Sequence, residues 1–192
     1  MRRLLLASSS PYRRELLSRL QLEFDCAAPE IDETAHMGEQ PEQLVRRLAL
    51  EKAQALARTH QQHLIIGSDQ VAVLGERILG KPYTFDRAKQ QLQDCSGRSV
   101  SFLTGLALLD SQTRTTQVDC VRFTVHFRAL SNQQIERYLR AEQPYDCAGS
   151  FKAEGLGVSL FLRTDGPDVT SLIGLPLIRL VDMLNNAGFE VP

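Results

Sequence analysis

The sequence predicts an α/β protein whose mixed β-sheet is flanked by helices. Apolar segments of strand-like composition alternate with amphipathic helical segments along the chain, which is the pattern of an α/β fold. Gly75-Glu76 is typical of a hairpin turn, and two long strand-like segments, at 99–109 and 115–129, follow one another directly. Because hairpins join antiparallel strands, we expect a mixed sheet instead of a purely parallel one.

The first half of the chain opens with a strand and a capped helix. Ser10 is a suitable N-cap, and Pro11 suits the first position of a helix. The elements that we expect here are a short buried strand at 4–7, a helix at 11–20, a polar irregular stretch at 25–40, a long helix at 41–59, a strand that starts at 64–66 and runs through 71–73, and its hairpin partner at 78–79.

The second half begins and ends with helices. Thr84 and Ser131 are suitable N-caps for two of them. The elements that we expect are a helix from 85 to near 97, strands at 99–109 and 115–129, a helix at 132–142, a glycine-rich stretch at 148–157, a strand at 158–162 and a last helix at 176–186. No clear linker separates these segments, so we expect residues 1–192 to form a single domain.

Length and charge exclude several classes of protein. The chain has 192 residues, with 22 basic and 23 acidic side chains and a formal net charge of -1. This balance excludes a globally basic nucleic-acid binder, and no apolar run approaches the ~20 residues that a membrane span needs. The apolar stretch at 4–7 is also too short for an export signal. We therefore expect a cytoplasmic protein with no nucleic-acid and no membrane partner.

Neither cysteine nor histidine spacing indicates a metal site. The four cysteines are Cys26, Cys95, Cys120 and Cys147, and no two have the C-x-x-C spacing of a zinc site. The histidines show no ligand spacing either. We expect the cysteines to be small buried side chains in a reducing compartment, without a disulfide framework.

The first helix begins with an unusual pair of charges. A helix N-terminus attracts anions, yet Arg13 and Arg14 occupy the first turn. The arrangement makes sense for Arg13 if a phosphate is held there by the helix dipole, by hydroxyl groups and by a guanidinium. The alternative is a solvated surface arginine, which we favour for Arg14. The chain has no Walker A sequence, so a P-loop is excluded.

Two charged residues fall inside apolar patterns. At 100° per residue, Lys52 points to about the same side as Val45 and Leu48, so its ammonium either finds an anion or extends past the stripe to water. Asp69 interrupts an apolar strand, where we expect it to be partly buried and to activate water or bind a metal; a turn between two strands is the alternative. If the hairpin folds back, Lys81 returns toward Asp69.

The stretch 149–157 contains three glycines, which indicates a backbone in close approach to another group. Glu154 lies between two of these glycines. A mobile loop is the alternative interpretation, and the residues alone do not decide between the two.

Short motifs in order along nearly the whole chain resemble those of the Maf family of nucleoside triphosphate pyrophosphatases. They are S-S-S-P-Y-R-R-E-L at 8–16, D-E at 32–33, E-K-A at 51–53, G-S-D-Q-V at 67–71, G-K-P at 80–82, S-G-R at 96–98, T-G at 104–105, D-C-A-G-S at 146–150 and G-L-P at 174–176. Each motif is weak alone, and the ordered set carries the resemblance.

The resemblance implies an elongated fold with two lobes around a cleft, and a homodimer. It implies cleavage between the α- and β-phosphates of a nucleoside triphosphate with a divalent metal, Mg²⁺ or Mn²⁺. The roles that it implies are general base for Asp69, phosphate ligands for Ser8, Arg13, Lys52 and Lys81, and metal ligands for Asp69 and Glu33. Several cations around one carboxylate–metal centre suit phosphoryl transfer, which depends on positioning and charge neutralisation.

Three departures from the common family pattern indicate a branch. Tyr12 stands in place of an arginine, Gln70 in place of a threonine and Glu154 in place of a glutamine. This combination resembles the branch that acts on 7-methyl-GTP and not the branch that acts on dTTP and UTP. N7-methylation makes guanine cationic, so a tyrosine face can stack on the base and a carboxylate can pair with its charge.

Two other functions remain open. One is a pyrophosphatase for dTTP, UTP or another modified nucleotide, and the other is a nucleotide-binding regulator of cell division without turnover. The presence of Asp69, Lys52 and Lys81 favours catalysis, because binding alone needs no general base. In every case the expected partner is a small-molecule nucleotide.

Overall fold

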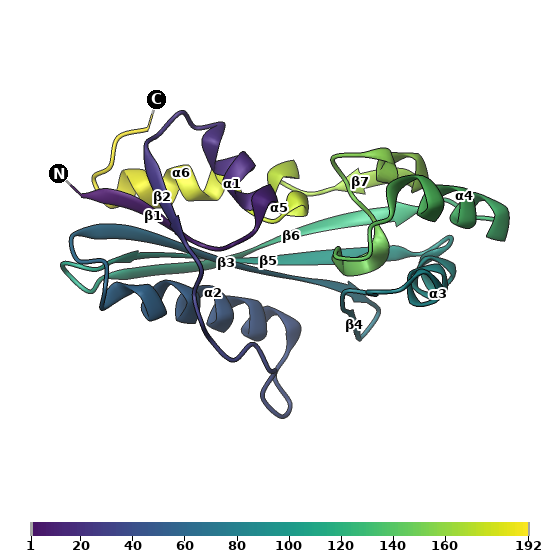
Figure 1. Cartoon of the computed structure of the whole chain (residues 1–192), viewed down its shortest axis with the longest axis horizontal. Helices are drawn as coiled ribbons and strands as arrows, with labels where there is room; N and C mark the ends of the chain where they lie inside the picture. Colours follow the sequence, from purple (N-terminus) through teal and green to yellow (C-terminus); the bar gives the residue numbers. More distant parts are fainter. Residues whose placement is uncertain (1, 192) are drawn as a thin grey trace. The chain divides into compact units, whose positions relative to one another are not determined.

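A computed structural model describes residues 2–191 of the chain. Helices and strands are interspersed along it, with the consecutive strand pairs β3–β4 and β5–β6 (Figure 1). The strands are β1 (Arg3–Ala7), β2 (Phe24–Ala27), β3 (His63–Leu74), β4 (Arg77–Leu79), β5 (Ser99–Asp110), β6 (Thr116–Phe127) and β7 (Phe161–Asp165). The helices are α1 (Pro11–Ser18), α2 (Pro41–Ala57), α3 (Phe85–Cys95), α4 (Asn132–Glu142), α5 (Val169–Ile173) and α6 (Leu177–Asn186), with 3₁₀ helices η1 (Ala148–Ser150) and η2 (Leu156–Leu160).

The strands of the described residues form a seven-stranded mixed sheet. Its order is β2-β1-β3-β5-β6-β7, and β4 pairs with β3. Strand β1 is parallel to β2 and to β3, whereas the β3–β4 and β6–β7 pairs are antiparallel. The predicted mixed α/β class is confirmed, and so is the hairpin at Gly75-Glu76.

The chain divides into two compact units. The first contains the residues up to Gln70, Thr104–Val121 and the residues from Asp168 on. The second contains Val71–Leu103 and Arg122–Pro167. Strands β3, β5 and β6 each contribute residues to both units. The expectation of a single domain with two lobes around a cleft stays a prediction.

Alternation along β1 and β3 builds two hydrophobic cores in the first unit. Successive side chains of a strand point to opposite faces, so each strand contributes to both cores. Helix α2 covers one face of these strands, and α1 and α6 cover the other (Figure 1). The core on the α2 face contains Leu5, Ala7, Ala53, Ala57, Ile65 and Leu109. The core on the opposite face contains Leu4, Leu6, Leu16, Leu17, Leu64, Ile66, Leu180 and Leu184 among others.

Two glycines let α2 approach the sheet closely. A Cβ atom added to Gly67 would lie 2.0 Å from the carbonyl oxygen of Ala49, and one added to Gly105 would lie 2.1 Å from that of Val45. Both distances are far below van der Waals contact, so only glycine fits at either position. The close approach sets the height of α2 above β3 and β5, and therefore the reach of every side chain on its inner face.

Aromatic packing organises the second unit. Phe102, Phe127, Phe151 and Phe161 meet edge to face, with ring centroids 4.9–5.7 Å apart, a spacing that aromatic pairs favour. Helices α3 and α4 lie beside each other and are linked by an ion pair of 2.7 Å between Lys89 and Glu136. The second unit thus has a core of its own.

Most of the predicted elements are present, and three differ. The edge strand β2 and the five-residue helix α5 have no counterpart in the sequence analysis, because both are short and are held by tertiary contacts. The predicted strand at 158–162 is wrong at its start: Leu156–Leu160 is a 3₁₀ helix, and β7 begins at Phe161. A tight turn causes the difference, since a Cβ on Gly157 would lie 2.2 Å from the Lys152 carbonyl oxygen.

The cysteines differ from the expected buried set. All four are free thiols, and Cys26 is exposed, whereas Cys95 is buried. Burial raises the pKa of Cys95 to about 12 and that of Cys147 to about 12, so neither thiol is readily ionised near neutral pH.

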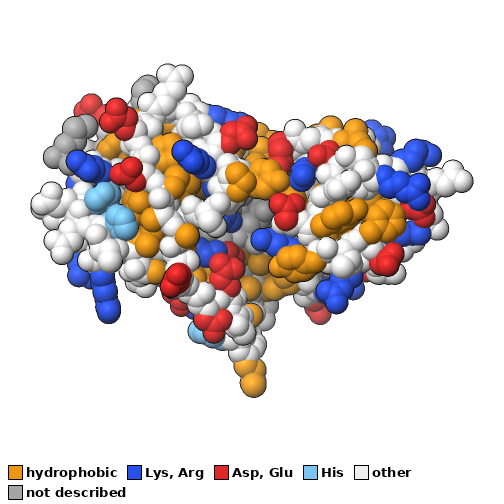
Figure 2. Space-filling model, in the orientation of Figure 1, with side chains coloured by type: hydrophobic (Ala, Val, Ile, Leu, Met, Phe, Trp, Pro, Cys, Tyr) orange, Lys and Arg blue, Asp and Glu red, His pale blue; other side chains and the backbone are white. Residues whose placement is uncertain are grey.

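The surface carries charges of both signs. Acidic and basic side chains are interspersed over the face that Figure 2 displays. Within residues 2–191, none of the helices is long and apolar enough to cross a membrane.

The close approach of α2 makes a stability prediction. Gly67→Ala should lower the free energy of unfolding by about 3 kcal/mol, because the new methyl group must push the backbone of α2 away from the sheet. Gly80→Ala is the matched control, since a Cβ at Gly80 meets no atom within 4 Å. Urea unfolding measures both. Equal stability of the two variants would show that α2 does not press on the sheet at Gly67.

Candidate active site

Strand β3 places three consecutive polar side chains on alternating faces of the sheet. Ser68 and Gln70 contact the backbone near α5, whereas Asp69 contacts Lys52 of α2. The strand is continuous from His63 to Leu74, so the predicted alternative of a turn between two strands is wrong. One continuous strand therefore holds polar side chains on both faces of the sheet.

A buried ammonium group lies between two carboxylates. Lys52 Nζ is 2.7 Å from Asp69 Oδ1 and 2.7 Å from Glu33 Oε1. The side chains of Lys52 and Asp69 are 8% and 11% exposed, whereas that of Glu33 is 59% exposed. A buried lysine needs an anion, and here the chain supplies two. Of the two alternatives for Lys52, pairing with an anion is the one observed.

Arg13 is anchored by one edge of its guanidinium. Its Nε donates a hydrogen bond of 2.9 Å to the carbonyl oxygen of Gly174. Ser68 Oγ lies 3.1 Å from the same oxygen and 2.8 Å from the Gly105 carbonyl oxygen, and its one hydroxyl proton is shared between these two acceptors. Burial lowers the pKa of Arg13 from its usual value, while the negative charges of Asp69 and Glu33 act in the opposite direction. Arg13 thus lies within electrostatic reach of both carboxylates. Arg14 is exposed, as predicted.

Gln70 connects the site strand to α5. Its Nε2 donates to Thr104 Oγ1 at 2.9 Å, to the Ser171 carbonyl oxygen at 2.7 Å and to the Leu172 carbonyl oxygen at 3.2 Å. Thr104 Oγ1 donates in turn to the Ser171 carbonyl oxygen at 2.9 Å. The amide nitrogen of Gln70 is therefore bound to groups within the protein.

The loop between β1 and α1 carries Ser8 and Tyr12. Ser8 is buried, and its Oγ accepts a hydrogen bond of 3.1 Å from the backbone N–H of Ser10. Ser10 is the N-cap of α1, as predicted, and Tyr12 is half-buried on the first turn of the helix. The serine-rich motif thus forms the entry to the helix that carries Arg13.

The structure brings four predicted residues together in the first unit: Asp69, Lys52, Glu33 and Arg13. Lys81 and Glu154 belong to the second unit, where both are exposed. Their approach to Asp69 stays a prediction.

Sequence reasoning missed the groups that hold the site residues. Thr104 and the Gly174 carbonyl anchor Gln70 and Arg13, and Arg47 holds the segment that carries Glu33. The T-G and G-L-P motifs contain Thr104 and Gly174. The motifs therefore marked these two positions but did not indicate that they hold Gln70 and Arg13. Arg47 gave no signal, because its partner Glu39 belongs to a polar stretch without periodicity.

The carboxylates fit a metal held jointly with a substrate, and not an all-protein cage. Within residues 2–191, no group of three or more His, Cys, Asp or Glu side chains could hold a metal ion. Mg²⁺ is commonly bound by one or two carboxylates together with substrate phosphates. Lys52 Nζ occupies the space between Asp69 Oδ1 and Glu33 Oε1, so a metal would be held by the other oxygen of each carboxylate.

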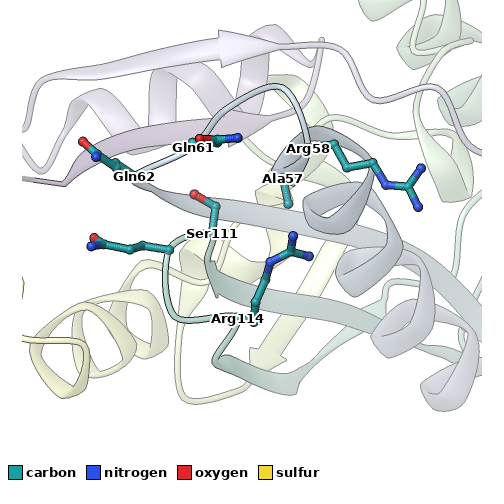
Figure 3. A pocket seen from close by; sticks show the side chains of 7 residues that line it. Ala57, Arg58, Gln61, Gln62, Ser111 and Arg114 are labelled. Carbon is teal, nitrogen blue, oxygen red and sulfur yellow. The ribbon is translucent and has the colours of Figure 1, made fainter.

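A separate hollow of about 380 Å³ lies at the end of α2 (Figure 3). Arg58 follows α2, and Arg114 belongs to the turn between β5 and β6, from where its side chain points toward Ala57. None of the residues that line this hollow is a predicted site residue, so the hollow is not part of the Asp69 site.

Comparison with known proteins gives consistent matches along the whole chain. The model of a family described as Maf-like protein matches residues 3–187. A Pseudomonas fluorescens Pf-5 protein named 7-methyl-GTP pyrophosphatase is 71% identical over 189 residues, which are 98% of either chain. A protein of the same name from Colwellia psychrerythraea is 52% identical and covers 100% of this chain and 96% of its own.

A likeness to one solved structure is much weaker. The Staphylococcus aureus Ham1 protein superposes with a TM-score of 0.47 and 14% sequence identity, over 67% of this chain and 73% of that chain. Such a value is too low to support any inference about fold or function.

The buried ion pair makes a second stability prediction. Lys52→Met should lower the free energy of unfolding by about 3 kcal/mol, because it leaves the buried Asp69 carboxylate without its ion-pair partner. Adding Asp69→Asn to this variant removes the uncompensated charge and should restore part of the loss. Urea unfolding at pH 7 measures both, and a double variant less stable than Lys52→Met would contradict the pairing.

Proposed function

This chain belongs to the Maf family, and we propose that it is a nucleoside triphosphate pyrophosphatase that hydrolyses 7-methyl-GTP to 7-methyl-GMP and pyrophosphate. The observation that carries the proposal is the buried Asp69–Lys52 pair with Glu33, in a chain 67–71% identical to Pseudomonas proteins named for that activity. Hydrolysis at phosphorus needs a base and several positive charges. Asp69 is the proposed base, and Lys52 and Arg13 supply two of the positive charges.

Asp69 is the general base in this proposal. Lys52 holds its Oδ1, which fixes the carboxylate and leaves Oδ2 to accept a proton from water. The water oxygen forms a bond to the α-phosphorus, the bond from that phosphorus to the bridging oxygen breaks, and pyrophosphate leaves. Because Asp69 and Lys52 are buried, bulk water screens the charges of these two side chains only weakly.

The phosphate ligands proposed are Arg13, Lys52, Ser8 and Lys81. Since Arg13 uses Nε on Gly174, its two terminal nitrogens can bind a phosphate as a fork. Lys52 has three N–H donors and uses two on carboxylates, so the third can reach a phosphate oxygen. Ser8 offers a hydroxyl donor, and Lys81 adds a further positive charge.

Asp69 and Glu33 are the proposed ligands of a divalent metal, Mg²⁺ or Mn²⁺. Such an ion supplies charge neutralisation to the triphosphate and acts as a Lewis acid when it is bound. The two carboxylates contribute hard oxygen ligands, which both ions prefer.

Tyr12, Gln70 and Glu154 are the proposed determinants for the methylated base. The cationic ring of 7-methylguanine can stack on the face of Tyr12. The free carbonyl oxygen of Gln70 can accept an N–H of guanine, because its amide nitrogen is held by α5. The carboxylate of Glu154 matches the positive charge of the base.

We further propose that the protein acts in the cytoplasm as a homodimer on a small-molecule nucleotide, with no nucleic-acid or membrane partner. Analytical ultracentrifugation of the purified chain tests the dimer, and a monomer at micromolar concentration would contradict it.

A substrate panel tests the proposed function. Pyrophosphate release is measured from 7-methyl-GTP, GTP, dTTP and UTP, each with Mg²⁺ and with a chelator. We expect the highest kcat/KM on 7-methyl-GTP and no release with the chelator. Faster release from dTTP or UTP would favour the other branch of the family, and binding without release would favour the regulator.

The role of Asp69 makes a kinetic prediction. Asp69→Asn should lower kcat by about 10²–10⁴-fold, because an amide cannot accept the proton from water. Circular dichroism checks that the variant is folded. A folded variant that keeps most of its rate would place the base elsewhere.

The charge of Glu154 makes a specificity prediction. Glu154→Gln should lower kcat/KM on 7-methyl-GTP by about 10-fold and leave that on GTP within about twofold, because only the methylated base is cationic. Glu76→Gln, another exposed glutamate of the second unit, is the control. Equal losses on both nucleotides would remove the charge argument.

A further inference from the structure

Arg47 of α2 binds two points of the segment 28–40, which carries Glu33. Arg47 Nε and one terminal nitrogen bind the two carboxylate oxygens of Glu39, both at 2.7 Å. That terminal nitrogen also donates to the Thr34 carbonyl oxygen at 3.1 Å, and the other donates to Glu51 Oε2 at 3.0 Å. The Arg47 and Glu39 side chains are 18% and 8% exposed, so this contact is shielded from water.

The segment held by Arg47 has little structure of its own. Residues 28–40 contain neither helix nor strand, and most of their side chains are exposed. Within the segment, Asp32 Oδ1 accepts from the Thr34 N–H at 2.9 Å, and Glu39 Oε2 accepts from the His36 N–H at 3.0 Å. Glu33 lies next to Thr34, one of the two points at which Arg47 holds the segment.

Glu33 reaches Lys52 from this loosely structured segment. Its side chain is 59% exposed, yet its carboxylate lies 2.7 Å from Lys52 Nζ. Ordering an exposed loop costs conformational entropy, which the two fixed contacts that follow Glu33 in the chain, at Thr34 and at Glu39, offset. A planar guanidinium that grips one carboxylate with two nitrogens suits this task, because its geometry is fixed.

We propose that Arg47, through Glu39 and the Thr34 carbonyl, is a positioning residue that holds Glu33 in the active site. The inference rests on the proposed function, since it assigns to Arg47 the task of presenting a metal-binding carboxylate. Arg47 does not contact substrate in this scheme. It acts through Glu33 and fixes where the segment 34–39 lies against α2.

The electrostatics of the contact agree with this role. The Arg47 guanidinium lowers the pKa of Glu39 to about 2, from an ordinary value near 4.5. A carboxylate with a lowered pKa contributes stability above its unfolded pKa and loses it as pH falls through its folded pKa. The contact between Arg47 and Glu39 therefore stays ionised across neutral and mildly acidic pH.

The neighbouring arginine provides a matched control. Arg46 is on the same helix and also makes ion pairs, of 3.1 Å with Glu42 and 3.4 Å with Asp119. None of these partners belongs to segment 28–40. Arg46→Ala thus removes one arginine and two ion pairs from α2 without touching the loop.

A double-mutant cycle with Glu33 is the decisive experiment. Arg47→Ala should lower kcat/KM for 7-methyl-GTP by about 10–100-fold, mainly by raising KM for Mg²⁺, as loss of a residue behind a metal ligand does. In a Glu33→Gln background the same change should cost no more than about threefold, because Glu33 no longer has a role to lose. Equal losses in both backgrounds would overturn the proposal, and Arg46→Ala should change neither.

We call the contacts of Arg47 with Glu39 and the Thr34 carbonyl the clamp. Hydrogen exchange in the free protein tests it without an activity measurement. The backbone amides of residues 34–40 should exchange faster in Arg47→Ala and in Glu39→Gln, and at the wild-type rate in Arg46→Ala. If the wild type does not hydrolyse 7-methyl-GTP, the proposed function fails, and exchange still decides the clamp. Unchanged exchange in Arg47→Ala would overturn it.

Discussion

The contact on which the site depends is the ammonium of Lys52 between the carboxylates of Asp69 and Glu33. A buried lysine is costly unless anions surround it, and a buried aspartate is costly unless a cation does. Each group therefore makes the other tolerable in the apolar layer between α2 and the sheet. The pair forms only because α2 comes within reach of β3, and it comes so close because Gly67 and Gly105 present no side chain to it.

Strand β3 ties this pair to a second set of contacts on the opposite face. Ser68 and Gln70 flank Asp69, and both bind backbone carbonyls of the segment around α5. The Gly174 carbonyl, bound by Ser68, also receives Arg13. A shift of β3 along its axis would therefore disturb Asp69 and the anchor of Arg13 together. This coupling holds Asp69 and Arg13 at a fixed separation, which the proposed reaction requires because it depends on positioning.

Local pattern predicted most of the elements and the unusual positions, but not the contacts between them. Helical periodicity placed Lys52 on an apolar face, and strand pattern made Asp69 conspicuous, yet neither pattern shows that the two meet. Their pairing depends on the height of α2 above the sheet, which is a tertiary property. The clamp at Arg47 was not predictable for the same reason, since it joins a helix to a segment without periodicity. Strand β2 and helix α5 are too short to give a local signal.

The charge balance of four clustered side chains bears on the proposed divalent metal. Arg13 and Lys52 carry two positive charges, and Asp69 and Glu33 carry two negative ones, so this group is close to neutral before substrate arrives. A neutral cluster has little field to attract a triphosphate of several negative charges. If Asp69 and Glu33 held a divalent ion, their negative charges would be neutralised. The two cations, no longer offset, would then be available to the triphosphate.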